Sequence, residues 1–162
     1  CCGISGRDGG LLKAVVERPE LGRVGGISSV RPGLLSCLMD GGYVPVVAPV
    51  AEGPDGRPLN INADYAAGAI AGALQAGYFV LMSDVPGVLD KNHVLLPRLT
   101  RKDIEDLKAD GTISGGMIPK VDACLSALDH GCRRSLILNG SEPSALRRYL
   151  TGGEALGTVI ED

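Results

Sequence analysis

The chain has 162 residues, of which 44% are hydrophobic, so it is long enough for one domain with a real core and too short for two large domains. Its formal charge of −3 arises from 16 basic and 19 acidic residues that are interspersed, which argues against a nucleic-acid-binding protein with its usual basic patch. No apolar run approaches the roughly 20 residues of a membrane span, and no signal segment opens the chain, so we expect a soluble cytoplasmic protein with no membrane partner. The 5 cysteines lack ligand-type pairing, so we expect reduced thiols and no protein metal site.

The first third of the chain predicts a helix, a strand and a hairpin. Residues 1–10 read as the end of a strand and a glycine-rich loop. Pro32 then stands in the first turn of a predicted helix that ends at the glycine pair 41–42. The apolar, β-branched run 44–50 predicts a buried parallel strand, and the turn residues 53–56 predict a hairpin.

Helices and strands alternate through the rest of the chain. Asp64 is placed where it can cap the next helix, and Thr100 caps a later, charged one. The predicted elements are a helix over 65–76, a strand over 78–82, helices over 100–109 and 117–130, a strand over 135–138, a helix over 144–150 and a strand over 158–160. This alternation predicts an α/β fold with a mostly parallel sheet.

Polar side chains gather at two glycine-marked element ends. Asn60, Asn62 and Asp64 lie in one short stretch, and Lys120 follows the glycine-rich segment 114–116 at the start of a helix. Such side chains are costly inside an apolar core, so their place beside apolar runs predicts a lined site at the edge of a packed layer. Each also has an ordinary structural interpretation: a helix cap for Asp64, a solvated surface lysine for Lys120, and a satisfied hairpin end for the asparagines.

Two loops are suited to a ligand. Segment 83–89 follows the strand over 78–82, and ligands of open parallel sheets bind beyond the carboxyl ends of the strands. Its residues are also ordinary turn formers. Segment 111–116 precedes the helix that carries Lys120, and the backbone amides of a glycine-rich loop at a helix N-terminus favour phosphate, although neither a Walker nor a dinucleotide motif is present.

These motifs together resemble those of N-acetylglutamate kinases, within the amino-acid kinase family. The matching segments, in the family's order and spacing, are 3–10, 45–49, 60–64, 83–89, 115–120 and 157–158. Asn-x-Asn-Ala-Asp followed by Gly-Met-Ile-x-Lys is specific for that enzyme, whereas Ser-Asp-Val-x-Gly is shared with carbamate, aspartate and uridylate kinases. The resemblance implies a three-layer αβα sandwich with a mostly parallel open sheet.

The resemblance also implies a reaction, in which ATP phosphorylates the γ-carboxylate of N-acetyl-L-glutamate in arginine biosynthesis, with Mg²⁺ bound mainly through the nucleotide phosphates. It implies that Lys120 stabilises the transferring phosphoryl group, that Asp64 organises the catalytic lysines, and that Asn60 and Asn62 bind the acceptor. The implied nucleotide-binding residues are Ser83, Asp84, Val85, Pro86, Gly87, Val88, Leu89, Thr112, Ile113 and Ser114. Residues 1–64 would belong to the acceptor-binding lobe and 65–162 to the nucleotide-binding lobe.

The family's N-terminal half, with its lysine-glycine-glycine phosphate loop and a substrate arginine, has no counterpart in this sequence. We therefore expect the chain to correspond to the C-terminal portion of such a kinase, to have little or no activity alone, and to belong to a homo-oligomer.

Three alternatives remain: an arginine-sensing, kinase-like domain of an N-acetylglutamate synthase, a carboxylate kinase acting on acetylaminoadipate, and a nucleotide- or effector-binding module. Glu154 and Gly157 resemble part of the family's arginine-effector site, and they also fit a helix end and a turn. The presence of Asp64 and Lys120 together favours the kinase.

Overall fold

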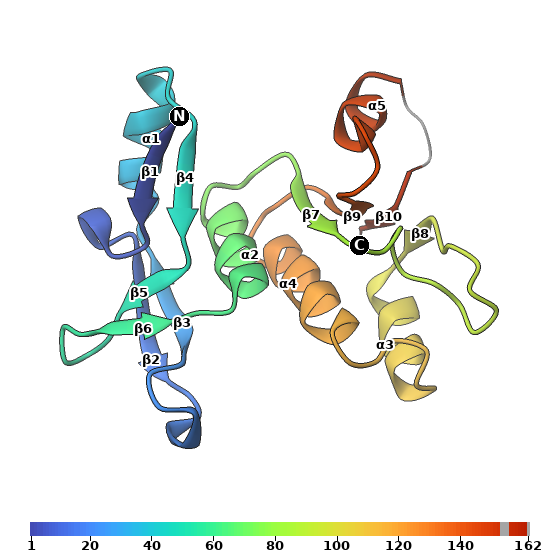
Figure 1. Cartoon of the computed structure of the whole chain (residues 1–162), viewed down its shortest axis with the longest axis horizontal. Helices are drawn as coiled ribbons and strands as arrows, with labels where there is room; N and C mark the ends of the chain where they lie inside the picture. The colour runs from blue at the N-terminus through green and yellow to red at the C-terminus, as the bar shows by residue number, and fades with distance from the viewer. Residues whose placement is uncertain (153–155, 162) are drawn as a thin grey trace.

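The structure is a computed structural model that describes residues 1–152 and 156–161. Two groups of strands lie on either side of a central pair of helices, α2 and α4 (Figure 1). The strands are β1 (Cys2–Ser5), β2 (Leu12–Val16), β3 (Gly25–Val30), β4 (Pro45–Ala48), β5 (Val50–Glu52), β6 (Pro58–Asn60), β7 (Phe79–Ser83), β8 (Arg98–Leu99), β9 (Ser135–Asn139) and β10 (Thr158–Ile160). The helices are α1 (Gly33–Asp40), α2 (Ala63–Ala73), α3 (Arg101–Ala109), α4 (Met117–Asp129) and α5 (Ala145–Gly152), with 3-10 turns η1 (Asp8–Gly10) and η2 (Pro19–Leu21).

The described strands form three sheets, each of which contains parallel pairs. β1 and β4 form a two-stranded parallel sheet, and the two four-stranded sheets have the orders β3-β2-β5-β6 and β7-β9-β10-β8. The pairs β2–β5, β7–β9 and β8–β10 are parallel, whereas β2–β3, β5–β6 and β9–β10 are antiparallel. The predicted α/β class is therefore confirmed.

Most predicted elements are present at or near their predicted bounds. The helix after Pro32 is α1, and the turn residues 53–56 connect the antiparallel strands β5 and β6. Thr100 caps α3 in a capping box with Asp103, as a Thr followed three residues later by an acid predicts. The antiparallel pair β2–β3 and the short strand β8 were not predicted, because their residues lack a clear apolar alternation.

The predicted buried strand over 44–50 differs from the structure. The run divides into β4 and β5, and β4 is parallel as predicted but not buried, since Val46 is 57% exposed. The hydrophobicity of this run specified extended structure, whereas burial also requires a covering layer.

Two buried clusters make up the core, and they meet along α2. One joins residues of β2, β5 and β6 to Leu35 and Ala66, and the other joins α3, α4, β7 and β9 to Ala71. Cys124 lies in the second cluster, where burial raises the pKa of its thiol to about 12. All five cysteines are free, as expected. None of the described helices has the length and apolar character needed to cross a membrane.

Candidate functional site

Asp64 and Lys120 form an ion pair between the first turns of α2 and α4. The Lys120 Nζ lies 3.1 Å from Asp64 Oδ2, and the two side chains are 23% and 20% exposed. The pair is therefore largely shielded from water while its edge stays accessible. The interpretation of Lys120 as a solvated surface lysine is wrong, and the neighbouring Asp122 pairs with Lys108 instead.

Small residues on facing sides of α2 and α4 bring this pair together. The two helices run in the same direction, since contacts between them advance in step along both chains: Asp64 with Lys120, Gly68 with Ala123, and Gly72 with Ala127 and His130. A Cβ on Gly68 would lie 2.7 Å from the Ala123 carbonyl oxygen, so the backbones approach more closely than a larger residue allows. Both helix N-termini therefore lie at one end, where the positive ends of the two helix dipoles favour an anion.

The cap of α2 is Asn62, and the prediction that Asp64 caps this helix is wrong. Asn62 Oδ1 accepts hydrogen bonds from the backbone amides of Asp64 and Tyr65, at 2.9 and 3.4 Å. The helix accordingly begins at Ala63, two residues earlier than predicted. Because Asn62 satisfies the terminal amides, the Asp64 carboxylate is available to Lys120.

Asn60 is the last residue of β6 and lies at the junction that leads into α2. Its backbone amide donates to the Arg23 carbonyl at 2.8 Å, and it pairs with Val50 of β5 on the other side. The residue as a whole is exposed. The segment 60–64 thus places Asn60, Asn62 and Asp64 along the connection that leads from β6 into the start of α2.

The predicted nucleotide segment 83–89 begins at the last residue of β7 and continues beyond the strand, and its members differ in environment. Ser83 is buried and donates through its hydroxyl to Asp84 Oδ1 at 3.1 Å, while Asp84 and Pro86 are exposed. Gly87 and Val88 are buried, and Val88 belongs to the core.

Thr158 of β10 holds this loop in place, a role that was not predicted for it. Its side chain is fully buried, accepts from the Val88 amide at 2.8 Å and donates to the Leu96 carbonyl at 2.7 Å. One hydroxyl thereby connects two places in the chain between β7 and β8, Val88 and Leu96, to β10. The signal in the sequence is a hydroxyl-bearing residue inside an apolar strand, which must find partners once buried.

An ion pair lies next to both predicted nucleotide segments, because Lys91 follows segment 83–89 and Asp110 precedes segment 112–114. Thr112 donates to Asp110 through both its amide and its hydroxyl, and Lys91, from the loop that follows 83–89, lies 2.9 Å from Asp110. The hydrogen bonds from Thr112 and the charge of Lys91 lower the pKa of Asp110 to about 2. Ile113 is 2% exposed and packs in the core, so only Thr112 and Ser114 present polar groups at the surface. Lys91 was missed because a lone lysine in a polar loop has no local pattern.

Two cavities lie near these elements. A cavity of about 300 Å³ lies beyond the carboxyl end of β9 and is lined by Pro86, Leu95, Leu138, Asn139, Glu142, Ala145, Leu156 and Gly157. A larger one of about 710 Å³ lies between β3 and the helices α2 and α4 and is lined in part by Ile61 and Tyr65, but by neither Asp64 nor Lys120. Pro86 of the loop after β7 lines the smaller cavity, whereas no residue of that loop lines the larger one.

Of the two residues predicted for an arginine effector, Glu154 lies outside the described residues. Gly157 lines the smaller cavity and has a φ of +76°, and a Cβ there would lie 2.1 Å from the Ile137 carbonyl oxygen. A glycine is therefore required at this position for the approach of β10 to β9. Its interpretation as a turn before a strand is confirmed by the geometry.

Comparison with known proteins identifies the family. The model of the amino acid kinase family matches residues 2–139, most of the chain. The chain belongs to the amino acid kinase family. Among its relatives, the acetylglutamate kinase of Acidiphilium cryptum is 45% identical over 173 residues, covering 98% of this chain and 57% of that protein. The acetylglutamate kinase of Methanopyrus kandleri is 49% identical over 147 residues, covering 85% and 60%.

A solved N-acetylglutamate synthase from Neisseria gonorrhoeae, in complex with coenzyme A and L-arginine, has the same fold as this member of the amino acid kinase family. Its TM-score is 0.83 at 23% identity, with coverage of 99% of this chain and 38% of that one. At this identity the likeness establishes the fold alone. The chain spans little more than half the length of the curated relatives, 57% and 60%.

Proposed function

We propose that the protein containing this chain is an ATP-dependent kinase that phosphorylates the γ-carboxylate of N-acetyl-L-glutamate. The observation that carries the proposal is the Asp64–Lys120 ion pair, at 3.1 Å, where the first turns of two parallel helices meet. The similarity to acetylglutamate kinases over 98% of the chain supports the same reaction.

The proposed chemistry needs charge neutralisation rather than a general base. A side-chain carboxylate has a pKa of about 4.3, so the acceptor is already ionised at neutral pH. Its oxygen forms the new bond to the γ-phosphorus as the bond to the bridging β,γ-oxygen breaks, which yields an acyl phosphate and ADP without net proton transfer. The step requires alignment of two anions and stabilisation of the phosphoryl oxygens.

Lys120 has the charge and the position to stabilise the phosphoryl oxygens. Its ammonium is a compact point charge, and the Asp64 carboxylate orients it at 3.1 Å. The amides at the start of α4, after the glycines 115–116, add partial positive charge at the same end of the helix. The nucleotide brings Mg²⁺, bound mainly through its phosphates, and this ion supplies further neutralisation.

We assign the nucleotide to the loop 83–89, the turn 112–114 and the cavity of about 300 Å³ that Pro86 lines. The Lys91–Asp110 ion pair joins the chain just after the first segment to the chain just before the second, which supports a common site. Asn60 and Asn62 are assigned to the acceptor, since they share one connection with Asp64.

The proposal is tested by trapping the acyl phosphate with hydroxylamine, in the complete gene product and in the 162-residue chain alone. In the complete protein, Lys120→Ala should lower kcat by about 10²- to 10³-fold, the usual cost of losing a group that stabilises transition-state charge. Lys108→Ala is the matched control, because Lys108 also pairs with an aspartate of this helix layer, Asp122, and should keep the activity of the unmodified protein. We predict little turnover by the isolated chain.

No acyl phosphate from the complete protein, or equal losses in the two lysine variants, would contradict the proposal. Calorimetry with acetylglutamate, acetylaminoadipate, an ATP analogue and arginine separates the alternatives. A response to arginine alone would favour the regulatory domain, and tighter binding of acetylaminoadipate would change the substrate.

A further inference from the structure

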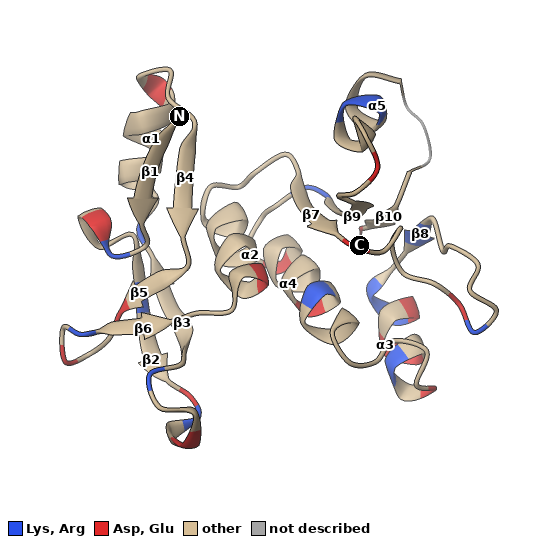
Figure 2. Ribbon diagram, viewed as in Figure 1, with Lys and Arg blue, Asp and Glu red and all other residues tan. Residues whose placement is uncertain are grey.

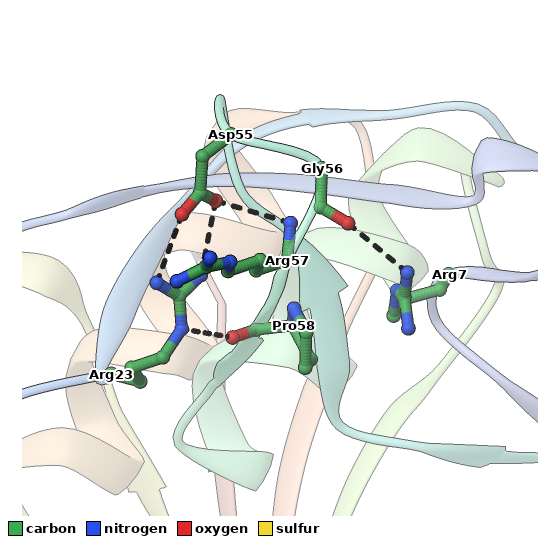
Figure 3. Close-up of polar contacts among 6 residues, drawn as sticks. All are labelled: Arg7, Arg23, Asp55, Gly56, Arg57 and Pro58. Carbon is green, nitrogen blue, oxygen red and sulfur yellow. Dashed lines mark hydrogen bonds and ion pairs between the residues drawn. The ribbon is translucent and has the colours of Figure 1, made fainter.

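Arg23 fixes the tip of the β5–β6 hairpin through three hydrogen bonds (Figure 3). Its two terminal nitrogens donate to the two carboxylate oxygens of Asp55, each at 3.0 Å, and its Nε donates to the Pro58 carbonyl at 2.8 Å. The fork of a guanidinium allows this bidentate pairing while a third donor reaches the returning strand. A single lysine ammonium cannot span both places.

The main chain of the same residue holds Asn60. The Arg23 carbonyl accepts from the Asn60 amide at 2.8 Å, and the next residue, Val24, forms a parallel bridge with Asn60. Leu59, which lies between Pro58 and Asn60, is fully buried. Strand β6 is therefore fixed by its pairing with β5 on one side and by Arg23 on the other, through both side chain and backbone.

Asp55 is the centre of the turn that Arg23 stabilises. Its Oδ1 also accepts from the Arg57 amide at 3.1 Å, and the adjacent Gly56 carbonyl accepts from Arg7 at 3.2 Å (Figure 3). The Arg23–Asp55 pair is about half exposed, with side chains 46% and 49% accessible, so its contribution to global stability is small. Its main consequence is local, because a turn without this pair is free to shift the end of β6.

We propose that Arg23 is a positioning residue for acceptor binding: by holding Asp55 and Pro58 it fixes the place of Asn60 in the acceptor site. The inference rests on the proposed function, and it adds a residue outside those assigned to the acceptor and to the nucleotide. Asn60 is the last of the three residues of β6, and Pro58, whose carbonyl Arg23 holds, is the first, so a shift of the turn passes along this short strand to Asn60.

Steady-state kinetics of the complete gene product test this role. Arg23→Ala should raise KM for acetylglutamate about tenfold while KM for ATP changes less than about twofold, because a small misplacement of one contact weakens only the ligand it binds. Arg23→Lys, which keeps the charge and loses the fork, should rescue only part of the effect. Arg57→Ala is the matched control, since it removes a cation from the same turn and retains the backbone amide that binds Asp55.

Each outcome decides the matter. Selective loss of acetylglutamate affinity in Arg23→Ala, absent from Arg57→Ala, supports the positioning role. An unchanged KM, equal shifts in both KM values, or equal effects of the two alanine variants overturns it and leaves the proposed function intact. Failure of the unmodified protein to phosphorylate acetylglutamate overturns both, and that result is distinguishable because it needs no variant.

Discussion

Strands β4 and β9 have similar apolar sequences and opposite environments. Val46 in β4 is 57% exposed, whereas Leu136, Ile137 and Leu138 in β9 are fully buried. β9 lies between β7 and β10 and contacts α4 and α5, while β4 pairs with β1 alone among the described strands (Figure 1). An apolar run thus indicates a strand, and the number of neighbouring elements decides whether it is buried.

The two groups of strands, β1 to β6 on one side of α2 and α4 and β7 to β10 on the other, are more alike in charge than in burial (Figure 1). Figure 2 shows Lys and Arg interspersed with Asp and Glu both on α3 and around the β5–β6 turn. The difference in burial between the two groups of strands therefore depends on packing.

Truncation of one side chain in each strand provides the sharpest test. Ile137→Ala should lower the free energy of unfolding by about 2–5 kcal/mol, since it leaves a cavity in a closed core. Val46→Ala should change it by less than about 0.5 kcal/mol, because most of that side chain is already in water. Urea unfolding followed by circular dichroism measures both values, and similar losses would show that β4 is covered in solution.

Loss of the Thr158 hydroxyl tests a buried polar contact in the better-packed group of strands, β7 to β10. Thr158→Val leaves the Val88 amide and the Leu96 carbonyl without their partner and should cost about 1–3 kcal/mol. Thr158→Ser retains the hydroxyl and should be closer to the unmodified protein in stability. In the complete gene product, the valine variant should also raise KM for ATP more than KM for acetylglutamate. Equal stabilities of the two variants would contradict the role of the hydroxyl.

Helix α2 lies between the regions, and its contact with α4 can be loosened at Gly68. Gly68→Ala places a methyl group 2.7 Å from the Ala123 carbonyl oxygen and should destabilise by about 1 kcal/mol, after the gain in helix propensity is subtracted from the cost of overpacking. Gly33→Ala in α1 is the control, since no atom lies within 4 Å of its added Cβ. Thermal melts of the two variants should move in opposite directions, and a shared direction would argue against close helix contact.

A smaller effect is expected for the exposed ion pair between Arg23 and Asp55, which lies in the group of strands β1 to β6. Arg23, followed by the Arg57 amide, lowers the pKa of Asp55 from 3.8 to about 2. Because the folded-state pKa is depressed, the stabilisation is present above about pH 3.8 and is lost as the pH falls through about 2. Carboxyl carbon NMR titration should show that Arg23→Ala raises the pKa of Asp55 while that of Asp110, also about 2, stays unchanged. An unshifted Asp55 would indicate that the pair does not persist in solution.

Local patterns predicted elements well and caps less well. Thr100 was predicted as a cap and is one, because a capping box is contained within four residues. Asp64 was predicted as a cap and is instead an ion-pair partner, because Asn62 competes for the same amides and a cap motif does not say which of two suitable residues binds. The Lys91–Asp110 ion pair and the arginine contacts of the β5–β6 hairpin had no local signal, since their partners are distant in the chain.

The α/β class, the positions of most helices and strands, and the polar residues at element ends follow from local sequence, since they depend on periodicity, turn residues and caps within about ten positions. The burial of β9, the exposure of β4 and the contact of Asp64 with Lys120 across 56 positions of sequence arise only when the chain is folded. Asp64 meets Lys120 because α2 and α4 pack closely in parallel at Gly68 and Gly72, which brings two helix starts to the same place and which neither helix encodes alone.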